Sequence, residues 1–170
     1  MPLFVDGYNL IFAASKRMQG FDISEPEAAR DRLVELLAKY RSIRSDRVEV
    51  FFDGGADAAH LPRHAAQRGI NIRFSDSQSD ADTDIKLAVT RHDNPRSVRV
   101  ISSDMAIQRF VKRYGAEVTD SETFLREVAD ALEDRSVPQD EPIEKYEDVP
   151  PDDIEYWLGV FGEELDDNDR

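Results

Sequence analysis

Residues 98 to 111 read Val-Arg-Val-Ile-Ser-Ser-Asp-Met-Ala-Ile-Gln-Arg-Phe-Val, and the hydrophobic pattern of this stretch changes half-way. Residues 98 to 101 are apolar enough for a short buried strand, which stops at the Ser-Ser-Asp run ending in Asp104. Residues 105 to 114 follow helical spacing, with inward-facing positions at Ile107, Phe110 and Val111. A strand followed at once by a helix is the unit from which α/β folds are built.

The same alternation recurs along the chain. Residues 24 to 27 combine Ser, Pro and two acids in a helix start, and apolar residues at helical spacing follow as far as Tyr40. Residues 57 to 68 are expected to form a short helix or a loop, broken near Pro62. Further strands are predicted at 3–5, 48–52, 70–74 and 115–118, and further helices at 80–91 and 121–132. Strands that alternate with helices predict a mostly parallel sheet flanked by helices.

The charge of the chain is unevenly distributed. The 170 residues carry a net charge of −14, but residues 134 to 170 hold 14 acidic and 3 basic residues. Residues 1 to 133 hold 22 acidic and 19 basic residues and are close to balanced. We therefore predict a globular domain over 1–133 and an acidic linker over 134–170 that contains Pro and ends in a short amphipathic helix.

Composition excludes several classes of protein. The sequence has no Cys, so neither disulfides nor a thiolate zinc site can form. No apolar run approaches the roughly 18 residues of a membrane span, and the first residues do not have the pattern of a signal peptide. We expect a soluble, cytoplasmic protein without a membrane partner.

Acidic residues stand where the predicted strands end. Asp6, Asp53 and Asp104 each follow a strand directly, and Asp82 lies in the first turn of a predicted helix. Because ligands of open parallel sheets bind at the carboxyl ends of the strands, these four side chains are expected to converge. Converging carboxylates repel unless a cation lies among them, and oxygen ligands alone suit Mg²⁺ or Mn²⁺. Such ions promote phosphodiester hydrolysis.

A simpler explanation exists for each acid taken alone. An Asp after a strand is often a turn or helix-capping residue. The run Asp80, Asp82 and Asp84 could be a solvated first turn that favours the helix dipole. On an ideal helix the side chains of residues 82 and 84 point about 200° apart. We therefore expect Asp80 and Asp84 to cap the helix or to support the site without binding the metal directly.

Four stretches in order carry a family resemblance: Phe4 to Ile11, Val50 to Gly54, Ala81 to Ile85 and Ser102 to Asp104. Together they resemble NYN domains of the PIN-like nuclease superfamily, and in particular the YacP-like branch. The likeness covers residues 3 to about 133. It implies a PIN-like, Rossmann-like α/β fold and metal-dependent cleavage of RNA by an endoribonuclease active in mRNA processing or decay. Association with the ribosome is known for some members.

The resemblance also implies roles for individual residues. Asp6, Asp82 and Asp104 would be the catalytic, metal-binding acids, and Asp53 would be a further ligand or a supporting acid. Asn9 would orient a ligand or touch phosphate, or else cap a helix. Ser103 would hydrogen-bond an acid or the substrate, or else only end a strand, and Asp84 would support the site.

Two questions about RNA remain open in the sequence. Candidate contacts to the RNA backbone are Arg63, Arg68, Arg73, Arg109, Lys112 and Arg113, although each alone is also explained as a solvated surface residue. The alternative to an enzyme is a catalytically inactive RNA- or ribosome-binding module. The retained acids count against it, because pure RNA binding gains nothing from repelling phosphate. Phosphatase, receiver and dinucleotide-binding patterns are absent after the first predicted strand.

Residues 153 to 161 carry an apolar stripe at Ile154, Trp157, Leu158 and Phe161, which is the spacing of one helix face. So short a helix needs a surface to pack on. We expect it to pack on its own domain, and the alternative is a protein partner. The acids of the tail would compete with RNA phosphates.

Overall fold

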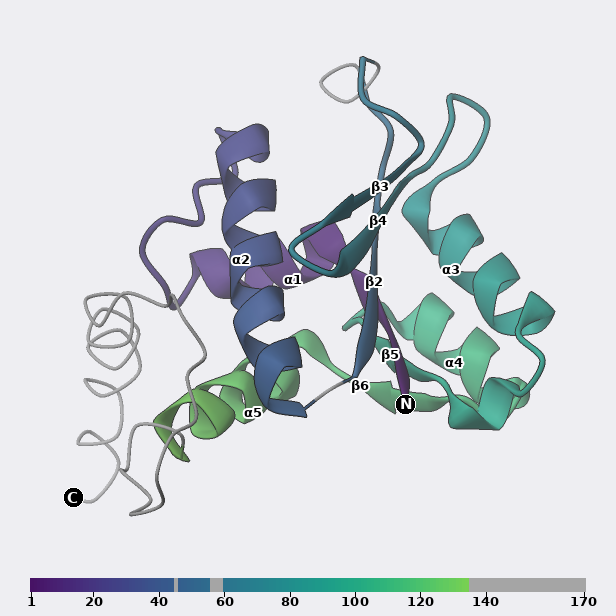
Figure 1. Ribbon diagram of the computed structural model, residues 1–170. Coiled ribbons are helices and arrows are strands. Elements are labelled where there is room, and N and C mark those ends of the chain that lie inside the picture. Colours follow the sequence, from purple (N-terminus) through teal and green to yellow (C-terminus); the bar gives the residue numbers. More distant parts are fainter. Residues whose placement is uncertain (45, 56–59, 135–170) are drawn as a thin grey trace.

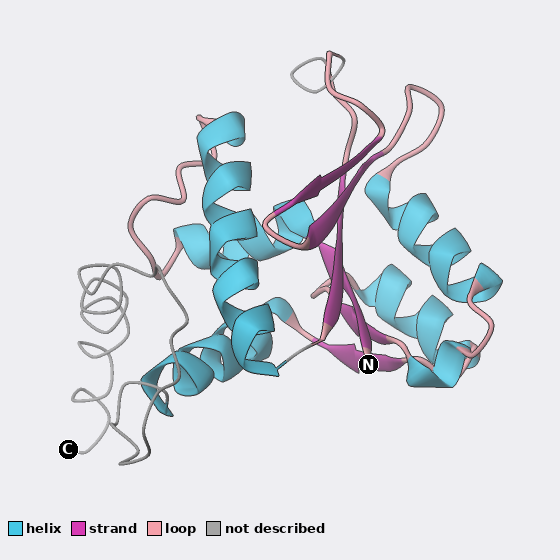
Figure 2. Ribbon diagram, viewed as in Figure 1, coloured by secondary structure: helices cyan, strands magenta, loops and turns pink. Residues whose placement is uncertain are grey.

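The computed structural model describes residues 1–44, 46–55 and 60–134 of the chain. Its elements alternate as the sequence predicts (Figures 1 and 2). In chain order they are β1 (Pro2–Asp6), α1 (Gly7–Ser15), α2 (Pro26–Arg44), β2 (Arg47–Phe52), β3 (His64–Gln67), β4 (Ile70–Phe74), α3 (Ala81–Arg91), the 3-10 turn η2 (Pro95–Ser97), β5 (Arg99–Ile101), α4 (Met105–Arg113), β6 (Glu117–Thr119) and α5 (Ser121–Asp134).

The strands form one mixed sheet in the order β3-β4-β2-β1-β5-β6. Every pairing is parallel except that of β3 with β4. In the centre of the sheet Val5 lies between Val50 and Ile101. The predicted α/β class, a mostly parallel sheet flanked by helices, is confirmed.

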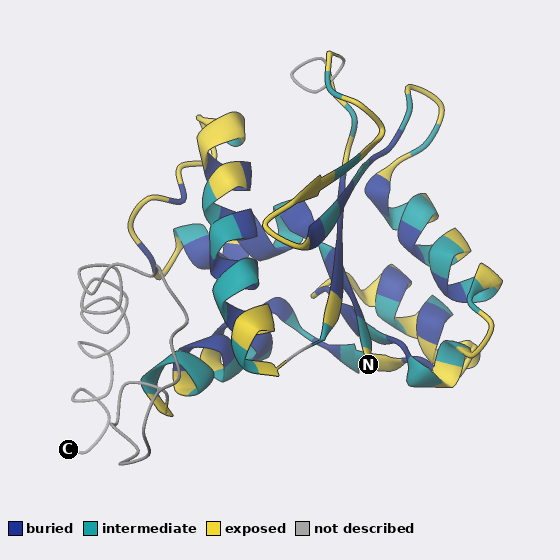
Figure 3. Ribbon diagram, in the orientation of Figure 1, coloured by how far each residue is buried: buried dark blue, intermediate teal, exposed yellow. Residues whose placement is uncertain are grey.

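Helices cover the sheet from both sides. Helices α1, α2 and α5 lie against one face, and α3 and α4 lie against the other (Figure 1). Because side chains alternate along a strand, each face of the sheet has its own apolar core. Val5, Val50 and Phe52 belong to the core under α1, α2 and α5, and Phe4 and Phe51 belong to the core under α3 and α4 (Figure 3).

Two elements differ from the sequence-based prediction. Helix α1 starts directly at Gly7, where only the end of a strand was expected, and its buried residues Leu10, Ile11 and Ala14 face the core. Residues 64 to 67 form strand β3, so the short helix or loop expected over 57–68 was wrong for these four residues. These four residues pair antiparallel with β4, and the pairing compensates for a local composition that is poor in strand formers.

Two further expectations concern the ends of the described chain. The acidic tail, including the predicted helix at 153–161, lies outside the described residues, so the boundary at 133/134 stays a prediction. In the part of the chain that the structure describes, no helix has the length and apolar content needed to cross a bilayer.

Candidate active site at the carboxyl edge of the sheet

The carboxyl ends of the parallel strands bring three of the four predicted acids to one edge. Asp6 ends β1, Asp53 follows β2 directly, and Asp104 lies between β5 and α4. The fourth, Asp82, belongs to the first turn of α3. Asp53 Oδ1 accepts a hydrogen bond of 2.7 Å from the backbone N–H of Ala81, the residue before Asp82. This bond holds the start of α3 against the end of β2.

Asp6 is the most perturbed carboxylate of the edge. Burial raises its pKa from 3.8 to about 6, and the negative charges of Asp53 and Asp104 add to the rise. Hydrogen bonds from the Ser102 hydroxyl, at 3.0 Å, and from the Asn9 N–H, at 3.4 Å, oppose it. A carboxylate in this environment repels further negative charge and is stabilised by a cation.

Asp104 is tied to Asp6 through a single hydroxyl group. The backbone N–H of Asp104 donates to Ser102 Oγ at 3.1 Å, and the same Oγ donates to Asp6 Oδ2. Asp104 Oδ1 also caps α4, accepting from the N–H groups of Ala106 at 2.7 Å and Ile107 at 3.0 Å. Ser102 is fully buried and therefore fixes the spacing of the two acids.

Asp82 is engaged by a neighbour on its own helix. Lys86 Nζ lies 2.6 Å from Asp82 Oδ1, one turn along α3. Asp80 caps the helix, since its Oδ1 accepts from the Thr83 N–H at 2.7 Å, and this bond lowers the pKa of Asp80. Asp84 accepts a hydrogen bond of 2.8 Å from the Ser79 hydroxyl. The capping role expected for Asp80 is therefore confirmed.

Asn9 and Ser103 connect the starts of α1 and α5 with the loop between β5 and α4. Asn9 Oδ1 accepts from the Ser103 N–H at 2.9 Å and from the Ser121 hydroxyl at 2.6 Å. Ser103 Oγ accepts from the Ser121 N–H at 3.0 Å. Ser103 thus bonds Asn9 and Ser121, and the residue that bonds an acid is Ser102. The sequence analysis missed Ser102 and Ser121 because these contacts link residues about a hundred positions apart.

The loop that carries Asp53 is fixed by a close backbone approach. The N–H of Gly54 donates to Ser75 Oγ at 2.8 Å. A Cβ atom at position 54 would lie 1.8 Å from the carbonyl oxygen of Ser75, which is a hard clash with backbone. Only Gly fits there, so Asp-Gly at 53–54 is one structural unit.

The acids do not form a ready-made metal cage. Across residues 1–44, 46–55 and 60–134, no group of three or more His, Cys, Asp and Glu side chains is gathered closely enough to hold a metal ion. The oxygen-rich edge nevertheless has the donor chemistry that Mg²⁺ and Mn²⁺ prefer. Of the predicted metal ligands, Asp82 is the one whose carboxylate has a cationic partner, Lys86, among the described residues.

The predicted RNA contacts fall on three parts of the fold. Arg63 and Arg73 line a groove on the face of the sheet. Arg68 lies in the turn between β3 and β4, with a positive φ of 50°. Arg109, Lys112 and Arg113 are exposed on α4.

Comparison with known proteins identifies the family of this chain. The YacP-like NYN domain matches residues 3–150. The chain belongs to this family. YacP of Bacillus subtilis strain 168 is 33% identical over 131 residues, which are 74% of this chain and 74% of YacP. NYN domains are generally nucleases, so membership indicates a nuclease-like function connected with RNA.

Solved structures agree with the family. The crystal structure of Rae1 (YacP) from B. subtilis superposes with a TM-score of 0.62 at 30% identity, covering 79% of this chain and 76% of that one. A crystal structure of a point mutant of the same protein gives the same TM-score and identity. That match covers 79% of this chain and 80% of the mutant's chain. The family match runs past residue 133, the end of the domain predicted from composition.

Proposed function

We propose that this protein is a metal-dependent endoribonuclease that hydrolyses phosphodiester bonds of RNA. The observation that carries the proposal is the meeting of Asp6, Asp53 and Asp104 at one edge, where Asp6 is largely buried and has a pKa of about 6. Without a metal, this arrangement opposes folding, because burial and like charges both disfavour ionised Asp6. A divalent cation would turn the same arrangement into a binding site.

The residues that would hold the cation are Asp6, Asp82 and Asp104, with Asp53 as a further ligand or as the anchor of α3. Bound Mg²⁺ or Mn²⁺ would lower the pKa of a water molecule and neutralise the phosphoryl oxygens. Ser102 would keep Asp6 and Asp104 at a fixed spacing. Asn9 would hold the start of α1 against the loop after β5, so that the two acids face the same phosphate.

Lys86 has a defined part in this proposal. In the structure its ammonium group neutralises Asp82. If Asp82 held a divalent cation, the ion pair with Lys86 would be weakened or lost. The released ammonium group would then be available to the substrate phosphate at the start of α3.

An inactive RNA- or ribosome-binding module is the second candidate, and one observation favours it. Among the described residues no three ligating side chains stand together as a finished metal site. Such a module would bind RNA equally well with and without a divalent cation. The two candidates therefore differ in their response to metal.

The test is cleavage of labelled single-stranded RNA in Mg²⁺ or Mn²⁺, with and without EDTA, and with and without ribosomes. We expect cleavage that EDTA stops and added metal restores. Calorimetric titration of Mn²⁺ into the protein provides a readout independent of activity. Binding of RNA without cleavage in either metal would favour the inactive module. A protein that neither binds nor cleaves RNA would refute both candidates.

The remaining sequence-based expectations belong to the same proposal. Residues 1–133 would carry the nuclease, and the tail from residue 134 would regulate RNA access or bind a protein partner. We propose that the enzyme works in the cytoplasm, where RNA and ribosomes are available to it.

A further inference from the structure

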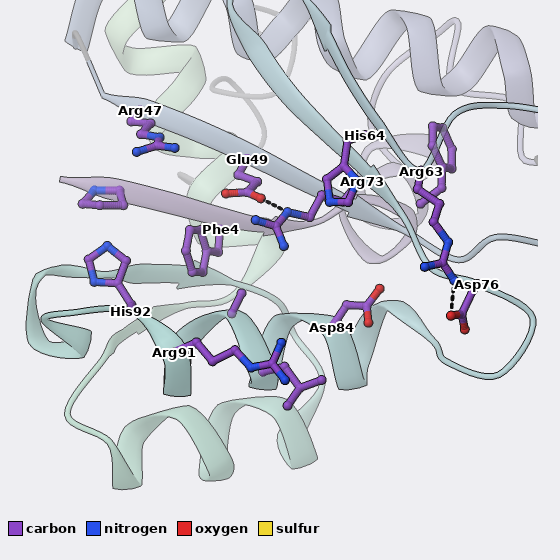
Figure 4. A pocket seen from close by; sticks show the side chains of 14 residues that line it. Phe4, Arg47, Glu49, Arg63, His64, Arg73, Asp76, Asp84, Arg91 and His92 are labelled. Atoms are coloured by element: carbon purple, nitrogen blue, oxygen red, sulfur yellow. Dashed lines mark hydrogen bonds and ion pairs between the residues drawn. The ribbon is translucent and has the colours of Figure 1, made fainter.

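A polar groove crosses the sheet on the side of α3 (Figure 4). Its volume is about 520 Å³, and β1, β2, β3, β4 and α3 contribute side chains to it. Arg47 and Arg91 lie at one end together with His92, and Arg63 and Asp76 lie at the other (Figure 4). We call this feature the sheet-face groove.

The groove exists because none of the helices that the structure describes covers this part of the sheet. The chain passes from β2 to β4 through strand β3, and the next helix, α3, packs over β1 and β2. Under α3 the inward side chains Phe4 and Phe51 are buried and apolar. On the outer half of the same face, β4 presents Arg73 and β3 presents His64. The side chains of this face thus change from apolar to charged where α3 stops covering the sheet.

Four arginines and three acids line the groove; the third acid, Asp84, accepts a hydrogen bond from Ser79 and has no arginine partner among the described residues. Arg73 is paired with Glu49, which is only 6% exposed, and Arg63 is paired with Asp76. No ion pair engages Arg47 or Arg91 within the described part of the chain. Both are exposed, so their charge is available to an anion from solution.

The direction of the groove connects it with the candidate active site. Asp82 and Asp84 lie in the first turn of α3, at the carboxyl edge, and Arg91 is the last residue of the same helix. At 1.5 Å per residue, Asp82 and Arg91 are separated by about 14 Å along the helix axis. The groove therefore leads from the carboxyl edge toward two unpaired cations.

We propose that the sheet-face groove binds the phosphate backbone of the part of a single-stranded RNA that extends beyond the cleavage site. Arg47 and Arg91 would form a phosphate subsite at the far end of the groove. This inference rests on the proposed function. Arginine binds phosphate through paired N–H groups and carries no base preference when it does so. The cations lie along a single groove and can therefore contact one phosphate backbone. A duplex would present two backbones, so single-stranded RNA fits the groove better. The groove thus adds affinity for longer substrates without choosing their sequence.

The first test compares the double variant Arg47→Ala/Arg91→Ala with Arg126→Ala. Arg126 is an equally exposed arginine on α5, against the opposite face of the sheet. Affinity for a fluorescent single-stranded RNA is measured in EDTA over a range of salt, so that no cleavage occurs. We expect the double variant to bind roughly 10-fold or more weakly at low salt. Its log-log salt slope should be shallower by about 1.4, at about 0.7 for each phosphate that is no longer bound.

A second variant is expected to raise the RNA affinity. A rise in affinity cannot result from a general loss of folding. Glu49→Gln removes a negative charge from the groove and releases Arg73, so RNA affinity should rise several-fold. Asp76→Asn should act in the same direction through Arg63 and changes a more exposed pair. Thermal unfolding of each variant shows whether it is folded before binding is compared.

Substrate length separates this inference from the proposed function. The double variant should cleave a dinucleotide as fast as the wild type, because so short a substrate does not reach Arg47 or Arg91. If the double variant binds long RNA with unchanged affinity and salt slope while the wild type still cleaves it, the groove is not an RNA site and the nuclease stands. If the wild type neither binds nor cleaves RNA, the proposed function fails first and the inference fails with it.

Discussion

The carboxyl edge and the sheet-face groove are both polar, but they handle charge in opposite ways. At the edge, Asp6, Asp53 and Asp104 interact repulsively, and within the described residues their charge is offset by N–H and O–H donors and by no ion pair. In the groove, four arginines face three acids: Glu49 and Asp76 each have an arginine partner, and Arg47 and Arg91 have none among the described residues. The edge is therefore suited to an external cation and the groove to an external anion. RNA with a bound divalent metal supplies both.

The largest effect should come from the acids of the edge. Asp104→Asn should reduce cleavage roughly 1,000-fold, since a metal's charge stabilisation is worth several kcal/mol and each 1.4 kcal/mol is tenfold. Asp82→Asn should do the same. Asn keeps the capping oxygen of Asp104, so the fold should persist. Cleavage rates with saturating Mg²⁺ provide the measurement.

Asp80→Asn is the matched control for these variants. It removes the same charge two residues from Asp82 and preserves the cap of α3, since Asn caps about as well as Asp. Activity should change little. Equal losses at positions 80 and 82 would show that Asp82 is not the acid that faces the metal.

The next effect concerns pH and stability. The pKa of Asp6 is about 6 in the folded protein and 3.8 without the fold, so the folded state holds this proton more tightly. Its stabilising contribution is fully present below pH 4 and is lost as pH rises through 6. The loss approaches about 3 kcal/mol, because one pKa unit corresponds to about 1.4 kcal/mol.

Asp6→Asn should therefore raise the stability of the metal-free protein at pH 7.5 by about 2–3 kcal/mol and leave it nearly unchanged at pH 4. Urea unfolding at both pH values in EDTA measures the difference. Added Mg²⁺ should narrow it, since the cation stabilises only the wild-type carboxylate. A variant that is less stable than the wild type at pH 7.5 would contradict the repulsion assigned to the edge.

A smaller effect tests the ion pair between Asp82 and Lys86 on α3. Lys86→Met removes the competitor for Asp82, so half-saturation should occur at several-fold lower Mn²⁺ concentration. Calorimetric titration of Mn²⁺ provides the readout. Arg109→Met, on the exposed side of α4, should leave the metal affinity unchanged. Weaker Mn²⁺ binding in Lys86→Met would mean that the lysine supports the metal site instead of competing for it.

The smallest effect should come from the acidic tail, which would compete with RNA for the cations of the groove. Deleting residues 136 to 170 should tighten RNA binding a few-fold at low salt and hardly at all at high salt. Fluorescence of Trp157 in the intact protein reports whether the segment is packed. A water-exposed emission maximum would exclude packing on its own domain and favour a protein partner.

Local sequence was sufficient where a pattern is repeated over several residues. Ile70 to Phe74 alternates strictly and forms β4 over those residues. Helix α1 was missed although Asp6 caps it, because Asp-Gly directly after a strand is also typical of a turn that ends the strand. Strand β3 was missed because its pairing with β4 outweighs a composition of His, Ala and Gln.

The candidate site divides in a similar way. The acids could be placed at one edge because strand ends in a parallel sheet share that edge. The bridge from Ser102 to Asp6 could not be predicted, because it joins residues 96 positions apart. Arg47 and Arg91 form one end of the groove only because of strand order and helix cover. Neither the strand order nor the helix cover can be predicted from one segment of the sequence at a time.

Asp104 caps α4 with the carboxylate that we propose as a metal ligand, and this would make metal binding observable from the backbone. The same group that is proposed to bind metal closes the first turn of α4 through the amides of Ala106 and Ile107. A cation that draws electron density from this carboxylate weakens it as a hydrogen-bond acceptor. The amide resonances of residues 106 and 107 should therefore move together during a titration with Mg²⁺, which gives a local NMR reporter that needs no RNA.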